Sequence, residues 1–380
     1  MAQGKGIREV SHFDCAGGGQ VMVDGHHAYI GHITAPEGTT IVDVSDPKHP
    51  RRVAELRIGP GLRSHKARAA NGIMLINHEI DPMARAPDRQ DPPVGLGIYD
   101  VSDPGRPKII TFWKCAGNGV HRFTFDGRYA YLSPVMEGYL KNIVLILDLE
   151  NPARPVEVGR WWMPGQWTAG GEARAYKEDG PRTPRCHHPI RMGDRLYVSY
   201  WHGGGFILDI SDMSKPKMIS AIDWTAAFPW PTHSLVPVPF PIHGHRWMLV
   251  ADEDVLPRET PKQPQMPAFL WMVNITDERH PVPVGSFQVE GIDGKGLPTN
   301  SGCHQPVEEI TGTEVACAWF EQGLRVIDIS NPHALREAAW YMPDPAPGEK
   351  RAASNDVFVD RRGLIYLIDR VRGLHILERV

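Results

Sequence analysis

Short apolar stretches rich in β-branched residues recur along the chain, and each one ends in a polar turn. The clearest copy runs from Gly323 to Pro332: a glycine, an alternating apolar run, Asp328 and then a Ser-Asn-Pro turn. Six further copies occur at 40–47, 97–104, 144–152, 205–212, 270–277 and, truncated, 373–377. They lie roughly 40 to 65 residues apart, a period that indicates a solenoid or a propeller.

Each repeat predicts four short antiparallel strands. In the copy at 120–162 the expected strands are 120–125, 128–133, 143–147 and 155–161, and Asp126-Gly127 forms a hairpin turn between the first two. No segment shows a sustained helical period. Consecutive four-stranded units predict an all-β fold, a seven-bladed β-propeller that forms a single domain over residues 1–380.

The two ends of the chain are expected to complete one blade together. The last repeat stops after its third strand, whereas residues 6–13 read as a strand that belongs to no repeat. We therefore predict that this N-terminal strand closes the last blade, which removes an unpaired edge from the ring.

The repeats resemble the LVIVD-repeat family of β-propellers. The resemblance rests on the apolar-Asp-apolar-Ser-Asp/Asn-Pro cores at 41–47, 97–104 and 324–332. It implies the propeller fold over nearly the whole chain. It does not imply an activity, because propellers host enzymes and scaffolds alike.

Composition narrows the class of protein only slightly. Hydrophobic residues make up 41% and charged residues 23%, as is usual for a globular protein. A net charge of −4 gives no indication of nucleic acid or an anionic membrane as a partner. Without an apolar leader or a stretch of about 20 apolar residues, a cytoplasmic protein is expected. Five scattered cysteines give no disulfide framework.

Loop lengths predict the functional face. Antiparallel alternation places the loops before the innermost strands and those after the second strands on the same face. The five long insertions all fall in such loops: 80–94, 164–186, 254–267, 288–302 and 342–354.

Five histidines occupy the same position in successive repeats, just where the innermost strand begins. They are His65, His121, His187, His233 and His304. Because inner strands converge on the axis of a propeller, we expect these imidazoles to meet at the mouth of its channel and to bind a transition metal. Iron or copper is favoured, and manganese, zinc or nickel would also fit. Alternatively, the histidines hydrogen-bond to the backbone or to water, and a register shift by one would exchange His187 for His188.

Further polar residues follow the second strands on the same face. Of these, Glu79, Glu253 and His202 are the predicted catalytic residues. A carboxylate there could orient an imidazole through its second nitrogen or act as a general base. The alternative is a solvated loop side chain. Cys186 and Cys303, which each precede one of the histidines, are expected to be buried between blades.

A propeller with several axial histidines is similar in architecture to carotenoid-cleaving oxygenases and to the selenium-binding-protein/methanethiol-oxidase group. This resemblance implies an oxygen-using oxidoreductase that acts on a small organic substrate, although the Cys-rich motifs of the second group are absent. The alternatives are a metal-dependent lyase or hydrolase, in the manner of oligogalacturonate lyases, and a non-catalytic protein-interaction propeller. No P-loop, Rossmann or Gly-x-Ser-x-Gly motif is present, so no organic cofactor is predicted. The sequence leaves the oligomeric state open.

Overall fold

The computed structural model describes residues 3–82, 92–174, 183–224, 227–228, 230–254, 268–289 and 301–380. All regular elements in these ranges are β-strands. None of the described residues belongs to a helix that could cross a membrane.

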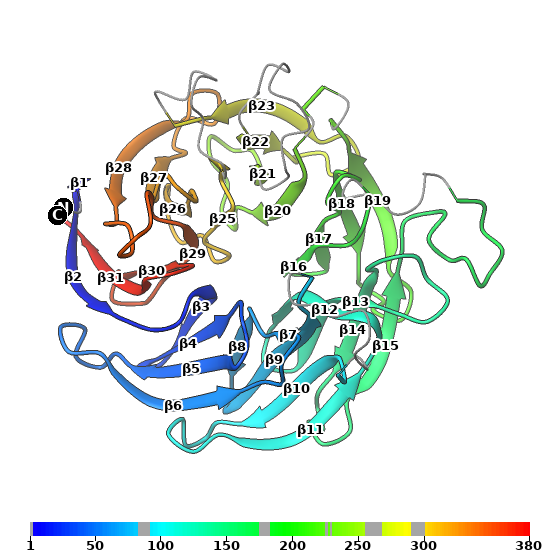
Figure 1. The fold of residues 1–380 in the computed structure, drawn as a ribbon. Helices are drawn as coiled ribbons and strands as arrows, with labels where there is room; N and C mark the ends of the chain where they lie inside the picture. Colours follow the sequence, from blue (N-terminus) through cyan, green and yellow to red (C-terminus); the bar gives the residue numbers. More distant parts are fainter. Residues whose placement is uncertain are drawn as a thin grey trace.

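Antiparallel strands surround a central axis, which makes the protein an all-β propeller (Figure 1). Hydrogen bonds join them into six sheets. One sheet contains β3 (Gly18–Asp24), β4 (His27–His32), β5 (Glu37–Asp43) and β6 (Arg51–Arg57). A second contains β16 (His188–Met192), β17 (Arg195–Ser199), β18 (Gly205–Asp209) and β19 (Lys217–Ile222). A third contains β20 (Thr232–Pro237), β21 (Trp247–Asp254), β22 (Leu270–Asn274) and β23 (Val282–Phe287), with β24 (Ser301–Gly302) paired to β21.

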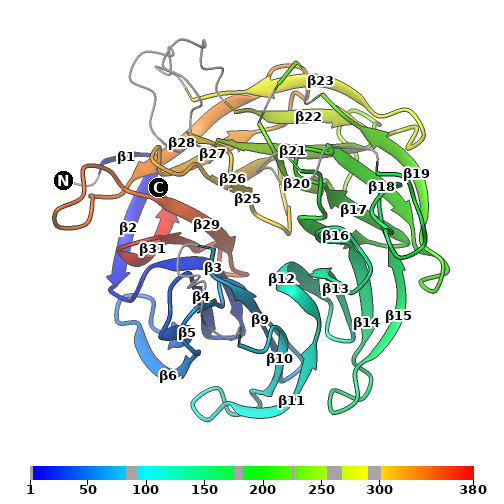
Figure 2. The same cartoon turned by 45° about the vertical axis from the view of Figure 1, so that its right-hand side comes forward.

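The next two sheets include the N-terminal strands. One has the order β1 (Gln3–Lys5), β28 (Arg336–Met342), β27 (Leu324–Asp328), β26 (Glu314–Ala318) and β25 (Gln305–Pro306). The other has the order β2 (Ile7–Phe13), β31 (Gly373–Arg379), β30 (Ile365–Asp369) and β29 (Ser354–Val359). The predicted closing strand is confirmed, since β2 pairs with β31 from Ile7–Arg379 to Phe13–Leu374 (Figure 2). The pairing of β1 with β28 was not predicted.

The sixth sheet has nine strands, which departs from the predicted seven separate blades. Its main order is β11 (Lys108–Lys114), β10 (Gly95–Asp100), β9 (Ile73–Ile80), β12 (Ala116–Phe125), β13 (Tyr129–Val135), β14 (Val144–Asp148) and β15 (Val156–Trp161). Two short strands, β7 (Leu62–Arg63) and β8 (Ala67–Ala70), also pair with β9. The physical reason is a single residue pair, Gly119 with Glu79, that links β12 to β9 and merges two repeats into one sheet.

The innermost strands contact one another in a closed order around the axis. The order is β3, β8, β12, β16, β20, β25 and β29, and the last of these contacts β3 again. The ring is therefore complete among the described strands. Five of them, β8, β12, β16, β20 and β25, contain a predicted histidine or begin one or two residues after one.

In six of the repeats an Asp or Asn side chain builds the turn that follows it. Asp43 accepts a hydrogen bond from the backbone N–H of Ser45 at 2.9 Å, and Asp46 accepts one from Lys48 at 3.0 Å. Equivalent bonds two residues along the chain occur at Asp100, Asp148, Asp209, Asn274 and Asp328. An Asx side chain bonded in this way fixes a tight turn, which explains why the repeat keeps Asp or Asn there.

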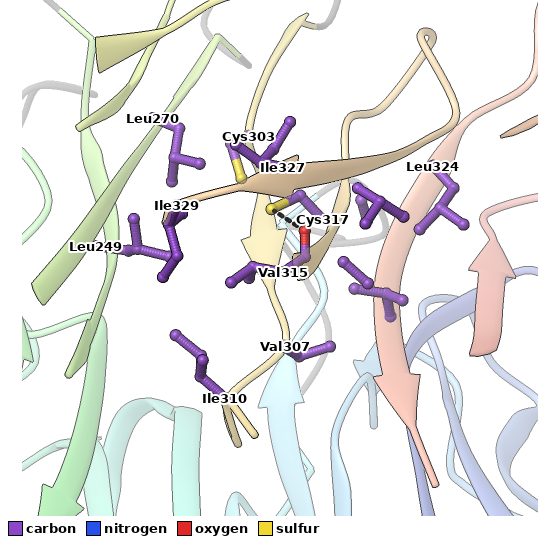
Figure 3. Close-up of a cluster of buried hydrophobic side chains, with 14 of the residues drawn as sticks. Leu249, Leu270, Cys303, Val307, Ile310, Val315, Cys317, Leu324, Ile327 and Ile329 are labelled. Carbon is purple, nitrogen blue, oxygen red and sulfur yellow. Dashed lines mark hydrogen bonds between the residues drawn. The ribbon is translucent and has the colours of Figure 1, made fainter. Parts of the chain in front are cut away.

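Each apolar run of the repeat buries its side chains between neighbouring sheets. Leu249 and Leu270 of one sheet pack with Ile327 and Ile329 of the next in one core cluster (Figure 3). Cys303 belongs to this cluster and Cys186 to another, and neither is exposed. The prediction that both are buried is confirmed.

The predicted insertions are only partly available for comparison. The loop at 342–354 is described in full, whereas 83–91, 175–182, 255–267 and 290–300 lie outside the described residues.

Candidate functional site

The five predicted histidines follow one another around the axis at the beginning of the inner strands. Ring centroids are 4.9 Å apart from His65 to His121, 4.7 Å from His121 to His187, 4.5 Å from His187 to His233 and 4.1 Å from His233 to His304. All are shielded from solvent except His121, which is partly exposed. We call these five side chains the histidine row.

The row does not converge on a single point. Among the described residues, ligand atoms within 4.8 Å of one another form two groups, His65–Glu79–His121 and His187–His233–Glu253. His304 belongs to neither group, and Arg122 Nη2 donates to its Nε2 at 3.1 Å. Whether any of the five binds a metal stays a prediction.

Hydrogen bonds fix how four of the imidazoles are protonated. The Nδ1–H of His187 donates to the carbonyl oxygen of His233 at 2.9 Å, and that of His304 donates to the carbonyl oxygen of Asn355. The Nδ1–H of His233 donates to Ser234 Oγ at 2.7 Å, since this hydroxyl gives its own proton to Gln305 at 3.2 Å. In each case Nε2 is left with a lone pair.

His121 also carries its proton on Nδ1, and here the acceptor is a carboxylate. Its Nδ1 lies 2.9 Å from both oxygens of Glu79, which also accepts a hydrogen bond from Arg63 Nε at 2.8 Å. Burial alone would raise the pKa of Glu79, but Arg63 and His121 beside it lower the pKa to about 2. Arg63 Nη2 also lies 3.3 Å from Nδ1 of His121, but the two carboxylate oxygens are closer. An ionised carboxylate can only accept, so His121 donates from Nδ1 and its Nε2 also carries a lone pair.

Two of these lone pairs face each other, because Nε2 of His121 lies 2.9 Å from Nε2 of His187. Such a contact requires a proton or a metal ion between the nitrogens. Burial lowers the pKa of His121 to about 4 and that of His187 well below its ordinary value, which disfavours the shared proton at neutral pH. In addition, Nε2 of His65 and Nε2 of His233 are buried without a hydrogen-bond partner, as expected for atoms that a ligand satisfies.

The predicted catalytic residues differ in their placement. Glu79 and Glu253 are buried within the two ligand groups, and a Glu253 oxygen lies 3.5 Å from Nε2 of His304. Burial raises the pKa of Glu253 to about 7, although Arg122 and Arg370 oppose the rise. His202 packs edge-on against Trp201 at 6.0 Å and is absent from the described lining of the cavity.

The choice between His187 and His188 is resolved in favour of His187 as the member of the row. His188 turns away into a second layer, where its Nε2 lies 2.9 Å from Lys66 Nζ and 3.3 Å from Glu308. Lys66 donates to Glu308 at 2.9 Å, and Arg68 contacts the same carboxylate. Because these residues come from different inner strands, the layer lies across the axis.

A cavity of about 490 Å³ opens beside the histidine row. Its lining includes His65, His121, His187, His304 and Glu253 together with four arginines, Arg63, Arg122, Arg185 and Arg370. Of these, Arg370 is one of the polar residues that the sequence places after a second strand on the functional face, whereas the other three were not predicted. Arg122 could have been found from its position, since it is a polar residue that directly follows a histidine of the row. Arg63 and Arg185 gave no periodic signal.

Comparisons with known proteins support the fold. Residues 18–55, 192–223 and 316–342 match the LVIVD repeat. No curated protein matches the chain. Among solved structures it resembles Saccharomyces cerevisiae Sqt1, with a TM-score of 0.58 and 9% identity over 94% of this chain and 82% of that one.

Two further similar structures carry the names of enzymes. The periplasmic gluconolactonase PpgL of Pseudomonas aeruginosa has a TM-score of 0.59 and 11% identity, covering 93% of this chain and 96% of that one. A putative 6-phosphogluconolactonase of Bacteroides uniformis has a TM-score of 0.56 and 11% identity, covering 85% and 88%. At such identities the likeness concerns the propeller fold alone.

Proposed function

We propose that the protein is a metal-dependent enzyme whose transition-metal site lies in the histidine row and acts on a small molecule in the adjoining cavity. The observation that carries this proposal is the 2.9 Å contact between Nε2 of His121 and Nε2 of His187. Both nitrogens carry lone pairs because both Nδ1 atoms donate elsewhere. The two lone pairs would repel each other, and a divalent cation bound by both would remove that repulsion.

Imidazole nitrogens of the histidine row would hold the ion, and such ligands suit transition metals. His121 and His187 are the proposed central ligands, and His233 beside His187 completes the set. Glu79 acts as a positioning residue, since it holds His121 in the required tautomer.

Hydrolysis or elimination is the chemistry that these residues favour. When bound, the metal supplies a Lewis acid that polarises a substrate oxygen. Glu253, with its pKa raised to about 7 by burial, can accept a proton near neutral pH. Because similar structures are named gluconolactonase and 6-phosphogluconolactonase, lactone hydrolysis is the first reaction to assay. The oxygen-using oxidoreductase stays a prediction, and iron or copper in the site would support it.

Metal analysis tests the proposal directly. The wild-type protein and a His245→Ala control, which removes an exposed histidine, should contain about one equivalent of a transition metal after incubation with Mn(II), Fe(II), Ni(II), Cu(II) or Zn(II) and gel filtration. A His121→Ala/His187→Ala double variant should contain almost none. A wild-type protein that retains none of these metals would refute the metal centre and favour the interaction propeller.

We also infer that the ring has seven sectors. Seven inner strands contact one another in order, and the nine-stranded sheet divides into two four-stranded units and β7 where only Gly119 and Glu79 pair. On this interpretation every sector contributes one inner strand to the axis, as the repeat count suggests.

A further inference from the structure

Two arginines on the cavity wall rest on aromatic rings in equivalent arrangements. The Arg185 guanidinium lies 4.4 Å from the ring centroid of Trp201, and that of Arg370 lies 5.0 Å from the ring centroid of Phe320. Each aromatic ring also contacts the histidine row. Trp201 stacks on His187 at 4.8 Å, and Phe320 packs on His304 at 4.5 Å.

The same backbone turn presents both aromatic residues. Trp201 has a φ of 52° and Phe320 a φ of 41°, in the left-handed region that bulky residues rarely adopt. The carbonyl oxygen of Trp201 accepts from the N–H groups of Thr232 and Gly204, and that of Phe320 accepts from those of Ser354 and Gly323. Backbone strain of this kind persists at sites where the position of the side chain matters for function.

Neither of the two arginines forms an ion pair with a described carboxylate, although Glu253 lies near enough to both to favour their charged forms. Among the described residues, no carboxylate lies within 4.0 Å of either guanidinium. Within the described part of the chain, Arg185 donates to the carbonyl oxygen of Thr183 at 3.4 Å, and Arg370 to the amide oxygen of Asn355 at 2.6 Å. Arg63, on the same wall, differs because it pairs with Glu79 at 2.8 Å. Although burial lowers the pKa of Arg185 to about 10, the group stays charged at neutral pH.

Guanidinium groups that line a cavity without an ion-pair partner favour a ligand that brings negative charge. Arginine offers several N–H donors in a plane that matches carboxylate and phosphate oxygens. Stacking on Trp201 and Phe320 restricts the two side chains before a ligand arrives, which reduces the entropy lost on binding. A volume of about 490 Å³ suits a molecule of metabolite size.

We propose that the cavity binds a small organic oxyanion, a carboxylate or a phosphate ester, through Arg185 and Arg370. This inference names the substrate class of the proposed enzyme and rests on that function only for the reaction, because anion binding needs no metal. The aromatic rings place the bound anion next to His187 and His304.

Calorimetric titration with two probes, gluconate and inorganic phosphate, tests the proposal on metal-free and metal-loaded protein. The wild type should bind at least one probe with a dissociation constant in the millimolar range or below, and the stronger probe identifies the oxyanion. Arg185→Met and Arg370→Met should each weaken binding about tenfold or more, the loss expected for a charge-assisted hydrogen bond. Arg106→Met, at an exposed turn, should change nothing.

If a methionine variant does not fold, the wild type provides a second measurement. Phenylglyoxal should modify Arg185 and Arg370, and the stronger probe should protect both in peptide mass spectra. Unchanged affinity in folded methionine variants, unprotected arginines, or no binding of either probe would overturn the anion site. A metal-loaded protein without anion affinity refutes only this inference, whereas anion affinity without any metal uptake refutes only the metal centre.

Discussion

Gly323, which opens one repeat, should be intolerant of any side chain. Its φ is +75°, and a Cβ atom built there would lie 2.3 Å from the carbonyl oxygen of Tyr341 in the paired strand. Its N–H donates to the carbonyl oxygen of Phe320, and its own carbonyl accepts from Trp319 at 2.8 Å. The glycine thus closes the turn that presents Phe320 to the histidine row.

The cost of Gly323→Ala can be worked out from these two effects. Left-handed backbone costs a residue with a Cβ about 1–2 kcal/mol, and relief of a clash with backbone in a packed sheet costs about 1–3 kcal/mol. Together they predict a loss of about 2–5 kcal/mol. For 380 residues the unfolding entropy is about 0.8 kcal/mol/K, so the melting temperature should fall by about 3–6 °C.

Scanning calorimetry on the wild type, Gly323→Ala and Gly312→Ala tests this estimate. Gly312 lies in a turn of the same sheet, has an ordinary φ, and would bring its Cβ atom into open space, so alanine there should leave the melting temperature unchanged or raise it slightly. If the two variants melt within about one degree of each other, the reasoning about the turn is wrong.

Three other predictions concern a buried ion-pair cluster, a turn and the closure of the ring. Glu308→Gln should lower the free energy of unfolding measured in urea by about 3–5 kcal/mol, because Lys66 and Arg68 lose their carboxylate partner. Glu309→Gln, at the exposed neighbour, should have little effect. Hydrogen bonds from Ser45 lower the pKa of Asp43 from 3.8 to about 2. The contribution of the ionised Asp43 to the free energy of unfolding is therefore complete above pH 4 and lost as the pH falls toward 2. Asp43→Asn should accordingly lose less stability than the wild type between pH 5 and pH 3. Deletion of residues 1–13 should leave the edge of β31 unpaired and produce aggregates in light scattering; a monomeric, fully stable product would contradict the closing role of β2.

The sequence predicts the propeller well because every sector repeats the same local chemistry. Asp328 fixes a turn through a bond two residues along the chain, and the apolar run before it alternates between sheet faces. Neither signal depends on distant parts of the chain. The number of separate sheets could not be predicted in this way, because the Gly119–Glu79 pair joins two repeats through one contact that no periodic pattern encodes.

At the site, the histidine row was predictable and its surroundings were not. Alignment of the repeats places His121 at the beginning of an inner strand, and alternation then sends Arg122 to the opposite side. The structure breaks that alternation, because the register of β12 shifts between Val120 and Phe123. Arg185 reaches the cavity from a loop, and no spacing in the sequence relates it to Arg370.

The register shifts explain how one ring of strands carries two polar layers. Similar irregularities occur in β3, β20 and β29 at the same level. A bulge lets two successive residues turn toward the axis, so the inner wall presents His121 above and Arg122 below. The lower guanidinium helps to hold the pKa of His187, His233 and His304 well below the ordinary value, in addition to burial. Neutral imidazoles with inward lone pairs are what a metal requires, and the carboxylates of Glu79 and Glu253 return the negative charge that a divalent cation needs. The bulge in β12 therefore places His121 in the row and, through Arg122, helps to keep its neighbours neutral.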